Sequence, residues 1–163
     1  MTRRTVGGRY TGRMPNLTPG DADDLLAAYK RARETRDVDA AMALYRSDAD
    51  LRTDPFGEHL AGELAIRAHW NRLALEQVNV EFDAERAWAS GSTVLAAWHG
   101  AWTRRDTAGR WRARGFVTFE LDEDRLVVRE RHWTLVRQVG IDTTVKPEPV
   151  PDDPGEGGAG DAG

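Results

Sequence analysis

The residues best suited to chemistry in this chain lie in the segment Asp54-Pro55-Phe56-Gly57. Proline cannot donate to a strand ladder and favours extended geometry in the residue before it, so Asp54 is expected at the end of a short strand. A carboxylate there could act as a general base if it is close to a substrate and desolvated. Burial against Phe56 and Trp70 would raise its pKa from about 3.9. The structural alternative is that Asp54 caps a turn or accepts backbone N–H groups.

Aromatic residues at helical spacing are the next candidates. Tyr29 and Tyr45 fall on the apolar stripes of two predicted helices, and Trp70 falls on the apolar face of a third. A phenol can pack its ring and still donate a hydrogen bond to a ligand. Each tyrosine could equally be a core residue whose hydroxyl bonds a backbone carbonyl.

Three helices followed by strands must position these side chains. Thr18-Pro19-Gly20-Asp21 combines a capping residue, a first-turn proline and an acid, which predicts a helix start. Asp37 is expected to cap a second helix that carries Tyr45, and Gly62-Glu63 to open the third. After Asn79 the hydrophobic period changes to two, which predicts strands separated by turns at 105–109 and 122–124.

The strand expected at 93–103 is apolar on both faces, so both faces should be covered. The helices would cover one face, and a second subunit could cover the other. The expected architecture is α+β: a cone-shaped barrel in which three N-terminal helices pack on a strongly curved, mostly antiparallel sheet. Residues 1–17 are expected to be a flexible segment, 18–140 the folded domain, and 141–163 a disordered tail rich in Pro, Gly and Asp.

Composition narrows the functional classes. The chain has 163 residues, a net charge of −4 and no cysteine. An acidic balance gives no general attraction for nucleic acid, and no apolar run approaches the roughly 20 residues of a membrane helix. We expect a cytoplasmic protein that binds neither nucleic acid nor a membrane. No Gly-rich phosphate loop, nucleophile elbow or metal-ligand spacing is present, so no metal and no cofactor is expected.

The order of these motifs resembles the nuclear transport factor 2-like superfamily, in its SnoaL-like and ketosteroid-isomerase-like branch. The resemblance spans about Leu25 to Val136. Its most specific part runs from Tyr29 to Trp70, and it includes Arg36-Asp37-Val38-Asp39, Asp54-Pro55-Phe56-Gly57 and the spacing of Gly62, Ile66 and Arg67.

The resemblance implies roles for several residues. Tyr29 falls where ketosteroid isomerases place an enolate-stabilising tyrosine, and Asp54 where they place the proton-shuttling acid. Tyr45 and Trp70 fall on the supporting aromatics. Val117 falls at or near the second oxyanion donor, a protonated aspartate in the isomerases. A valine cannot donate, which argues against steroid isomerisation. SnoaL-type cyclases use an aspartate from a late strand, and the segment 130–134 has none.

The final predicted strand has two faces. By family register, the face bearing Val127, Arg129, Arg131 and Trp133 is expected to look inward. Arg129 could then pair with Asp54 or bind an anionic ligand group. The alternative is that Arg129 and Arg131 pair with Glu120 or Glu85 on neighbouring strands.

Two hypotheses follow. In the first, the domain binds a small, largely apolar or carbonyl-bearing molecule and catalyses isomerisation, cyclisation or dehydration, with Asp54 as the base and Tyr29 as the hydrogen-bond donor. The expected ligand-binding residues are Tyr45, Phe56, Trp70, Val117, Arg129 and Trp133. In the second, the domain is a ligand-binding or dimerisation module without turnover, and it forms a homodimer through the outer sheet face.

Overall fold

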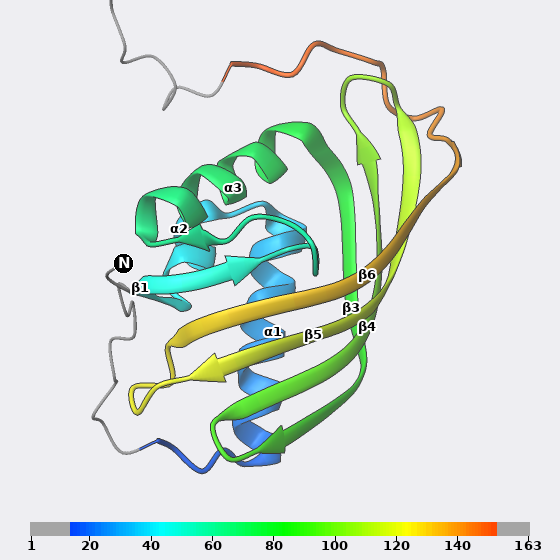
Figure 1. Ribbon diagram of the computed structural model, residues 1–163. Helices are drawn as coiled ribbons and strands as arrows, with labels where there is room; N and C mark the ends of the chain where they lie inside the picture. Colours follow the sequence, from blue (N-terminus) through cyan, green and yellow to red (C-terminus); the bar gives the residue numbers. More distant parts are fainter. Residues whose placement is uncertain (1–13, 153–163) are drawn as a thin grey trace, which may run out of the picture.

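The computed structural model describes residues 14–152, which form three helices and six strands. In chain order, the elements are α1 (Pro19–Thr35), α2 (Val38–Met42), β1 (Tyr45–Arg52), β2 (Leu60–Ala61), α3 (Glu63–Glu76), β3 (Gln77–Ser90), β4 (Thr93–Arg104), β5 (Gly109–Leu121) and β6 (Val127–Ile141). The helices pack on a curved sheet that does not close, as Figure 1 shows. The α+β class and the helical cover expected from the sequence are therefore confirmed.

The helix starts follow the predicted capping chemistry. Thr18 and Asp21 form a reciprocal capping box at the start of α1, and Asp37 accepts the backbone N–H of Ala40 at the start of α2. The second helix differs from expectation because it ends at Met42. Tyr45 is instead the first residue of β1, where its side chain is still buried.

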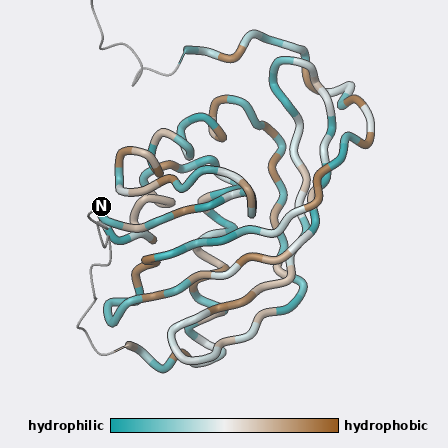
Figure 2. The backbone as a smooth tube through the Cα atoms, in the orientation of Figure 1, coloured by the Kyte–Doolittle hydropathy of each residue, from teal (hydrophilic) through white to brown (hydrophobic). Residues whose placement is uncertain are grey.

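The six strands form one sheet in the order β2-β1-β6-β5-β4-β3. All neighbouring pairs are antiparallel except β1 and β6, which run parallel. The long strands β3 to β6 curve around α1, and α3 lies across the same concave side (Figure 1). The concave face and the helices enclose the hydrophobic core, in which Ile66, Val94, Val117 and Phe119 are completely buried. Apolar and polar stretches alternate along the strands in Figure 2.

Two β-bulges reverse which side chains face this core. The pairs Leu121–Val127 and Glu120–Arg129 leave Val128 as an extra residue in β6. An extra residue shifts the two-residue alternation by one position, so Val127 and Glu130 both face inward. The inward orientation expected for Arg129, Arg131 and Trp133 is therefore wrong.

A second bulge lies in β3, where Ala84 pairs with Trp98 and Arg86 pairs with Ala97. Phe82 is buried on the inner face, whereas Trp88, beyond the bulge, is exposed. The simple alternation expected for this strand, with Phe82 and Trp88 on one face, is broken at the same point.

The segments flanking the domain make specific contacts. Leu17 is buried, and its N–H donates to the carbonyl of Gly91. Past β6, Asp142 accepts hydrogen bonds from Asn79 and Thr103, and the N–H of Glu148 donates to Arg105. The folded contacts thus extend beyond the boundary expected after residue 140. The rest of both predicted tails, 1–13 and 153–163, lies outside the described residues.

We predict that Gly115→Ala destabilises the fold by about 3 kcal/mol, the upper part of the usual cost of overpacking. A Cβ at Gly115 would collide with the carbonyl oxygen of Trp133, so β5 and β6 would have to separate beside Thr134. Gly140→Ala is the matched control, because a Cβ there meets nothing within 4 Å. Urea unfolding of both variants measures the difference. Equal stability of the two variants would contradict the close approach.

Candidate active site

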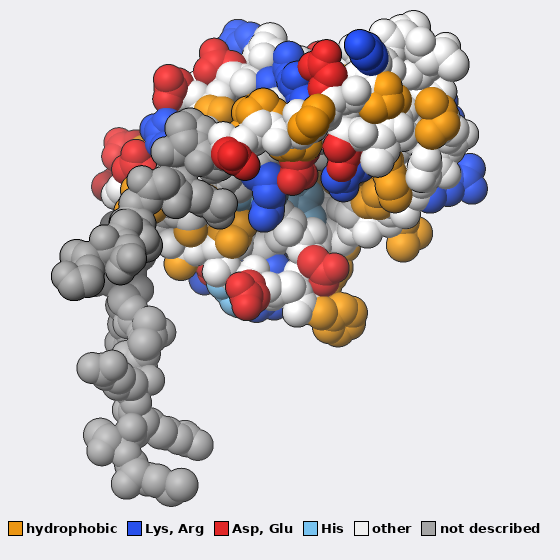
Figure 3. All heavy atoms as spheres, turned by 90° about the horizontal axis from the view of Figure 1, so that it is seen from above, with side chains coloured by type: hydrophobic (Ala, Val, Ile, Leu, Met, Phe, Trp, Pro, Cys, Tyr) orange, Lys and Arg blue, Asp and Glu red, His pale blue; other side chains and the backbone are white. Residues whose placement is uncertain are grey.

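A cavity of about 240 Å³ lies between the concave sheet face and the helices. Its wall is formed by side chains of α1, β1, α3 and β3 to β6 and by the segment after β1. The lining residues used below are Tyr29, Arg33, Asp54, His69, Trp70, Gln77, Trp98, Glu130, His132 and Thr134. Seen from above, the surface is hollowed between acidic and basic side chains, and histidine atoms are visible inside (Figure 3).

Glu130 of β6 is the central polar group of this cavity. Its side chain is 1% exposed, and it accepts three hydrogen bonds. The hydroxyl of Tyr29 donates to Oε1 at 3.0 Å, and that of Tyr45 donates to Oε2 at 2.5 Å. His132 Nε2 lies 2.5 Å from Oε1. Trp70 Nε1 in turn donates to the Tyr45 hydroxyl oxygen at 3.3 Å.

This network keeps the carboxylate ionised and the phenols neutral. Burial acts to raise the pKa of Glu130, but the hydrogen bond and the charge interaction with His132, followed by the hydrogen bonds from Tyr45 and Tyr29, hold the pKa below its ordinary value. Burial, followed by the negative charge of Glu130, raises the pKa of both Tyr29 and Tyr45 well above 10. Both hydroxyls therefore stay protonated and serve as donors.

Glu130 and His132 form a carboxylate–imidazole pair. Because the ionised carboxylate only accepts hydrogen bonds, Nε2 of His132 must carry the proton that they share. In the neutral ring the lone pair then belongs to Nδ1, which makes no hydrogen bond to any described residue. Trp98 packs edge-on against the imidazole, with ring centroids 6.1 Å apart, and stacks on Phe82. Glu130 thus orients the imidazole of His132, and an apolar wall lies beside the ring.

Other polar atoms of the wall lack partners. Within residues 14–152, His69 Nδ1, Trp98 Nε1 and Thr134 Oγ1 are buried without a hydrogen bond. Burial lowers the pKa of His69 to about 4, so His69 is neutral near pH 7. Buried groups without partners are uncommon in folded proteins and indicate strain, bound water or a functional role.

Asp54 lies at the rim of the cavity. It is exposed, and its Oδ1 accepts the backbone N–H of Phe56 at 2.7 Å. This is the turn-capping arrangement that the sequence left open, although Asp54 also contributes to the cavity lining. Phe56 is 100% exposed. Asp54 and Tyr29 therefore border the same cavity, but no hydrogen bond joins them in the described part of the chain.

The remaining expected site residues fall into two groups. Tyr45 and Trp70 belong to the Glu130 network, and Val117 is fully buried on β5, where it is the strand partner of His132. Arg129 and Trp133 instead lie on the outer face. Arg129 pairs with Glu120 at 3.0 Å, which is the cross-strand alternative, and Trp133 is 47% exposed.

Sequence reasoning passed over Glu130 and His132, which are the centre of the site. Glu130 is not the aspartate that the resemblance implies for the segment 130–134, and the bulge at Val128 reverses the face that simple alternation predicts for it. One signal was available: an acid and a histidine at i and i+2 share a strand face. Within the described residues, no group of three or more His, Asp or Glu side chains is arranged to hold a metal ion, and no helix is long and apolar enough to cross a membrane.

We predict that Glu130→Gln lowers the unfolding free energy by about 3 kcal/mol at pH 7, because the hydrogen bonds from Tyr29, Tyr45 and His132 lose their charged acceptor. Folding lowers the pKa of Glu130, so its ionised form stabilises the fold above the ordinary value of 4.5. That contribution is lost as the pH falls through the lower folded-state pKa. The difference in unfolding free energy between wild type and Glu130→Gln should therefore become smaller at acidic pH.

The control is Glu120→Gln, which removes the exposed partner of Arg129 and should cost about 0–1 kcal/mol. Urea unfolding at several pH values between 7 and 3 measures both. If the stability lost in Glu130→Gln does not change with pH, or if both variants lose the same stability, the ionised state assigned to Glu130 is contradicted.

Comparisons with known proteins agree with this architecture. No curated protein matches the sequence. Among solved structures, the epoxide hydrolase/cyclase-like enzyme SalBIII, which has a role in pyran ring formation in the polyether salinomycin, superposes with a TM-score of 0.66 at 18% identity over 75% of this chain and 96% of its own.

One further structural neighbour is in complex with a steroid derivative, and another was designed to bind a steroid. RV0760c from Mycobacterium tuberculosis, in complex with estradiol-17beta-hemisuccinate, has a TM-score of 0.61 at 16% identity over 69% of this chain and 92% of its own. A computationally designed 17-OHP binder has a TM-score of 0.62 at 17% identity over 72% of this chain and 97% of its own. At such identities these likenesses concern the fold alone.

The family assignment comes from the sequence match. The family model of the SnoaL-like domain matches residues 25–130. This range includes α2, α3 and α1 apart from its start, together with the strands as far as Glu130 in β6. The chain therefore belongs to the SnoaL-like domain family, within the nuclear transport factor 2-like superfamily.

Proposed function

We propose that this protein is an acid/base enzyme acting on a small carbonyl- or hydroxyl-bearing molecule, and that the His132–Glu130 pair transfers the proton. The observation that carries the proposal is the buried carboxylate held 2.5 Å from an imidazole whose other nitrogen is unbonded, in the wall of a mainly apolar cavity. An ionised carboxylate orients such an imidazole and stabilises the imidazolium that forms when it accepts a proton.

The proposed step is the removal of a proton from a carbon next to a carbonyl. The proton moves to Nδ1 of His132, the C–H electron pair becomes the C=C bond of an enolate, and the negative charge moves to the carbonyl oxygen. In a β,γ-unsaturated ketone the enolate is conjugated, and the imidazolium returns the proton to the γ carbon, giving isomerisation. In a β-hydroxy ketone the enolate charge re-forms the carbonyl, a C=C bond forms between the α and β carbons, and the C–O bond of the hydroxyl breaks as the imidazolium protonates it, giving water. Trp98 N–H and Thr134 O–H, which lack partners, are the candidates to donate to the enolate oxygen after small side-chain adjustments.

This assignment changes the roles expected for Tyr29 and Asp54. The Tyr29 hydroxyl donates to Glu130, so we assign Tyr29 to positioning the carboxylate. Asp54 is the rival base, because it borders the cavity, but it is exposed and already accepts the N–H of Phe56. An exposed carboxylate lacks the desolvation that would strengthen it as a base.

Deuterium exchange tests the proposal without knowledge of the natural substrate. Acetophenone, cyclohexanone, δ-valerolactone and 4-acetylbenzoate are incubated with the protein in D2O near pH 7, and loss of the C–H signals next to the carbonyl is followed by proton NMR. We expect the protein to accelerate exchange of at least one compound. His132→Asn should reduce that rate by about 100-fold or more, the usual contribution of a general base.

His99→Asn is the matched control, because His99 lies on the outer face and contacts Asp83 and Glu85. Asp54→Asn decides between the two bases: a large loss there, with His132→Asn unaffected, would transfer the role to Asp54. Absence of accelerated exchange for every compound would count against enolate chemistry in this cavity.

The outer sheet face supports a second role, as a homodimer interface. Phe116 and Trp133 are cross-strand partners on β5 and β6, with exposures of 48% and 47%, and the neighbouring Leu135 is 84% exposed. Ala97 of β4 is paired with Phe116 and extends the apolar strip. Exposed apolar strips with charged borders commonly mark protein interfaces.

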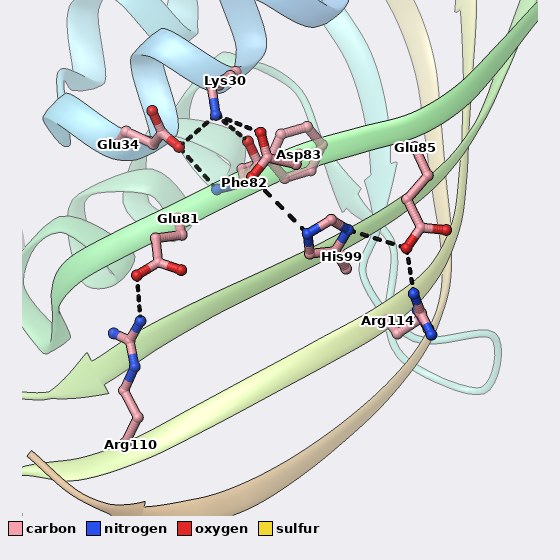
Figure 4. A network of polar contacts seen from close by, with 9 residues as sticks. All are labelled: Lys30, Glu34, Glu81, Phe82, Asp83, Glu85, His99, Arg110 and Arg114. Atoms are coloured by element: carbon pink, nitrogen blue, oxygen red, sulfur yellow. Dashed lines mark hydrogen bonds and ion pairs between the residues drawn. The ribbon is translucent and has the colours of Figure 1, made fainter.

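The borders of this strip are oppositely charged, which suits a second copy of the chain. β3 carries Glu81, Asp83 and Glu85, whereas β5 and β6 carry Arg110, Arg112, Arg114 and Arg137. Figure 4 shows part of this arrangement, with His99 between Asp83 and Glu85 and with Arg110 and Arg114 paired to acids of β3. Two copies related by a two-fold axis would place the acidic border of one over the basic border of the other.

Sedimentation velocity tests the interface. We expect a dimer at micromolar concentration, and we expect Leu135→Glu to shift it to monomer because a charge would enter the apolar strip. Leu64→Glu, an equally exposed leucine at 85% on α3, is the control and should leave the dimer intact. A wild-type monomer under these conditions would contradict the interface.

A further inference from the structure

Arg33 gives the cavity a positive charge that the proposed chemistry does not use. It lies on the last turn of α1, one helical turn beyond Tyr29, and lines the cavity together with Gln77. Its NH2 group donates to Oε1 of Gln77 at 3.4 Å, and its guanidinium carbon lies 5.7 Å from the Trp70 ring centroid. Among residues 14–152, no carboxylate forms an ion pair with Arg33.

A structural role at the end of α1 does not account for this arrangement. A basic side chain near a helix C-terminus is favourable, and a guanidinium on an indole gains cation–π energy. However, Arg36 already occupies the C-cap, and its side chain donates to the carbonyls of Ala74 and Gln77. Arg33 donates to no backbone carbonyl in the described part of the chain. Its donor groups are therefore available on the cavity side.

The cavity wall carries charges of both signs. Glu130, ionised and fully hydrogen-bonded, is negative at one place, and no ion pair connects it to Arg33. An anionic group entering the cavity would be attracted by Arg33 and repelled by Glu130. Such a molecule would bind with its anionic group at Arg33 and not at Glu130. A guanidinium fork also matches the two oxygens of a carboxylate.

We propose that the ligand of this cavity is a small carboxylic acid, whose carboxylate is held by Arg33 while its carbonyl- or hydroxyl-bearing end faces His132 and Glu130. The placement of the carbonyl- or hydroxyl-bearing end at His132 and Glu130 rests on the proposed function. The binding of the carboxylate by Arg33 does not. A monoanion is favoured over a phosphate dianion because Glu130 already places a negative charge in the same cavity. The volume of about 240 Å³ is below the roughly 300–1,000 Å³ of drug-sized sites, which limits the acid to about one ring.

Binding of matched acids and neutral analogues tests the proposal independently of turnover. Benzoate is compared with benzamide, and 4-acetylbenzoate with its methyl ester, by isothermal titration calorimetry at pH 7. We expect each acid to bind wild type about tenfold or more tightly than its neutral partner, the size typical of a charge-assisted hydrogen bond. In amide NMR spectra, the acids should shift the side-chain NH2 signals of Gln77 more than the neutral compounds do.

Arg33→Gln should abolish the preference for the acid, and Arg33→Lys should retain part of it. Arg36→Gln is the matched control, because it removes a neighbouring positive charge that bonds backbone carbonyls, and it should keep the full preference. Absence of any acid preference in wild type, or a preference that survives in folded Arg33→Gln, would overturn the proposal. If Arg33→Gln does not fold, the wild-type affinities and the Gln77 signals still decide it.

An acid preference without accelerated deuterium exchange would retain the carboxylate site and reject the base chemistry. Accelerated exchange of the neutral ketones without an acid preference would retain the base chemistry and reject the carboxylate site. The two proposals can therefore fail separately.

Discussion

A carboxylate buried away from water is the constraint on which the interior of this protein depends. An ion in an apolar interior is costly unless donors surround it, and Glu130 has three of them, from Tyr29, Tyr45 and His132. These donors come from α1, β1 and β6 itself, so the first helix, the first strand and the last strand must meet at one point. The network therefore joins the N-terminal and C-terminal parts of the domain, and it prepares the oriented imidazole that we propose as the base.

The curvature of the sheet creates the space in which that imidazole can act. Strands β3 to β6 bend around α1, and the close approach of Gly115 to the backbone of Trp133 shows how tightly β5 and β6 are apposed near the cavity. Aromatic rings pack together on the concave side, where the ring centroid of Tyr29 lies 5.2 Å from those of Phe82 and Phe119. Such packing holds side chains in defined rotamers, which is what a proton-transfer site needs.

Charge is distributed differently on the two faces of the sheet. The outer face carries exposed ion pairs such as Arg129–Glu120 and Arg114–Glu85, which contribute little to stability individually. The inner side carries few charges, and each has a defined environment: Glu130 is fully bonded, His69 is neutral, and Arg33 has no acidic partner among the described residues. This contrast separates the surface that could bind another copy from the cavity that could bind a small anion.

The bulges explain where sequence reasoning failed at the site. A hydrophobic period of two was sufficient to find the strands, and it placed Val127 correctly on the inner face. One extra residue at Val128 then moved Arg129 and Trp133 outward and brought Glu130 and His132 inward. Nothing local in the residues around Val128 indicates the bulge, because its position depends on how β6 must pair with β5 and β1 together.

The sequence by itself determined the helix starts, through Thr18, Asp37 and Gly62, since capping is a local effect. It also predicted the change from helix to strand, which the alternation placed after Asn79 and the structure places at Gln77. It also identified Tyr29, Tyr45 and Trp70 as inward-facing aromatics, all of which join the Glu130 network. Only the tertiary structure decided which acid is buried, because Asp54 and Glu130 are chemically alike in the sequence. Their different environments arise from strand pairing and helix packing between residues far apart in the chain, and those long-range contacts are invisible to any local pattern.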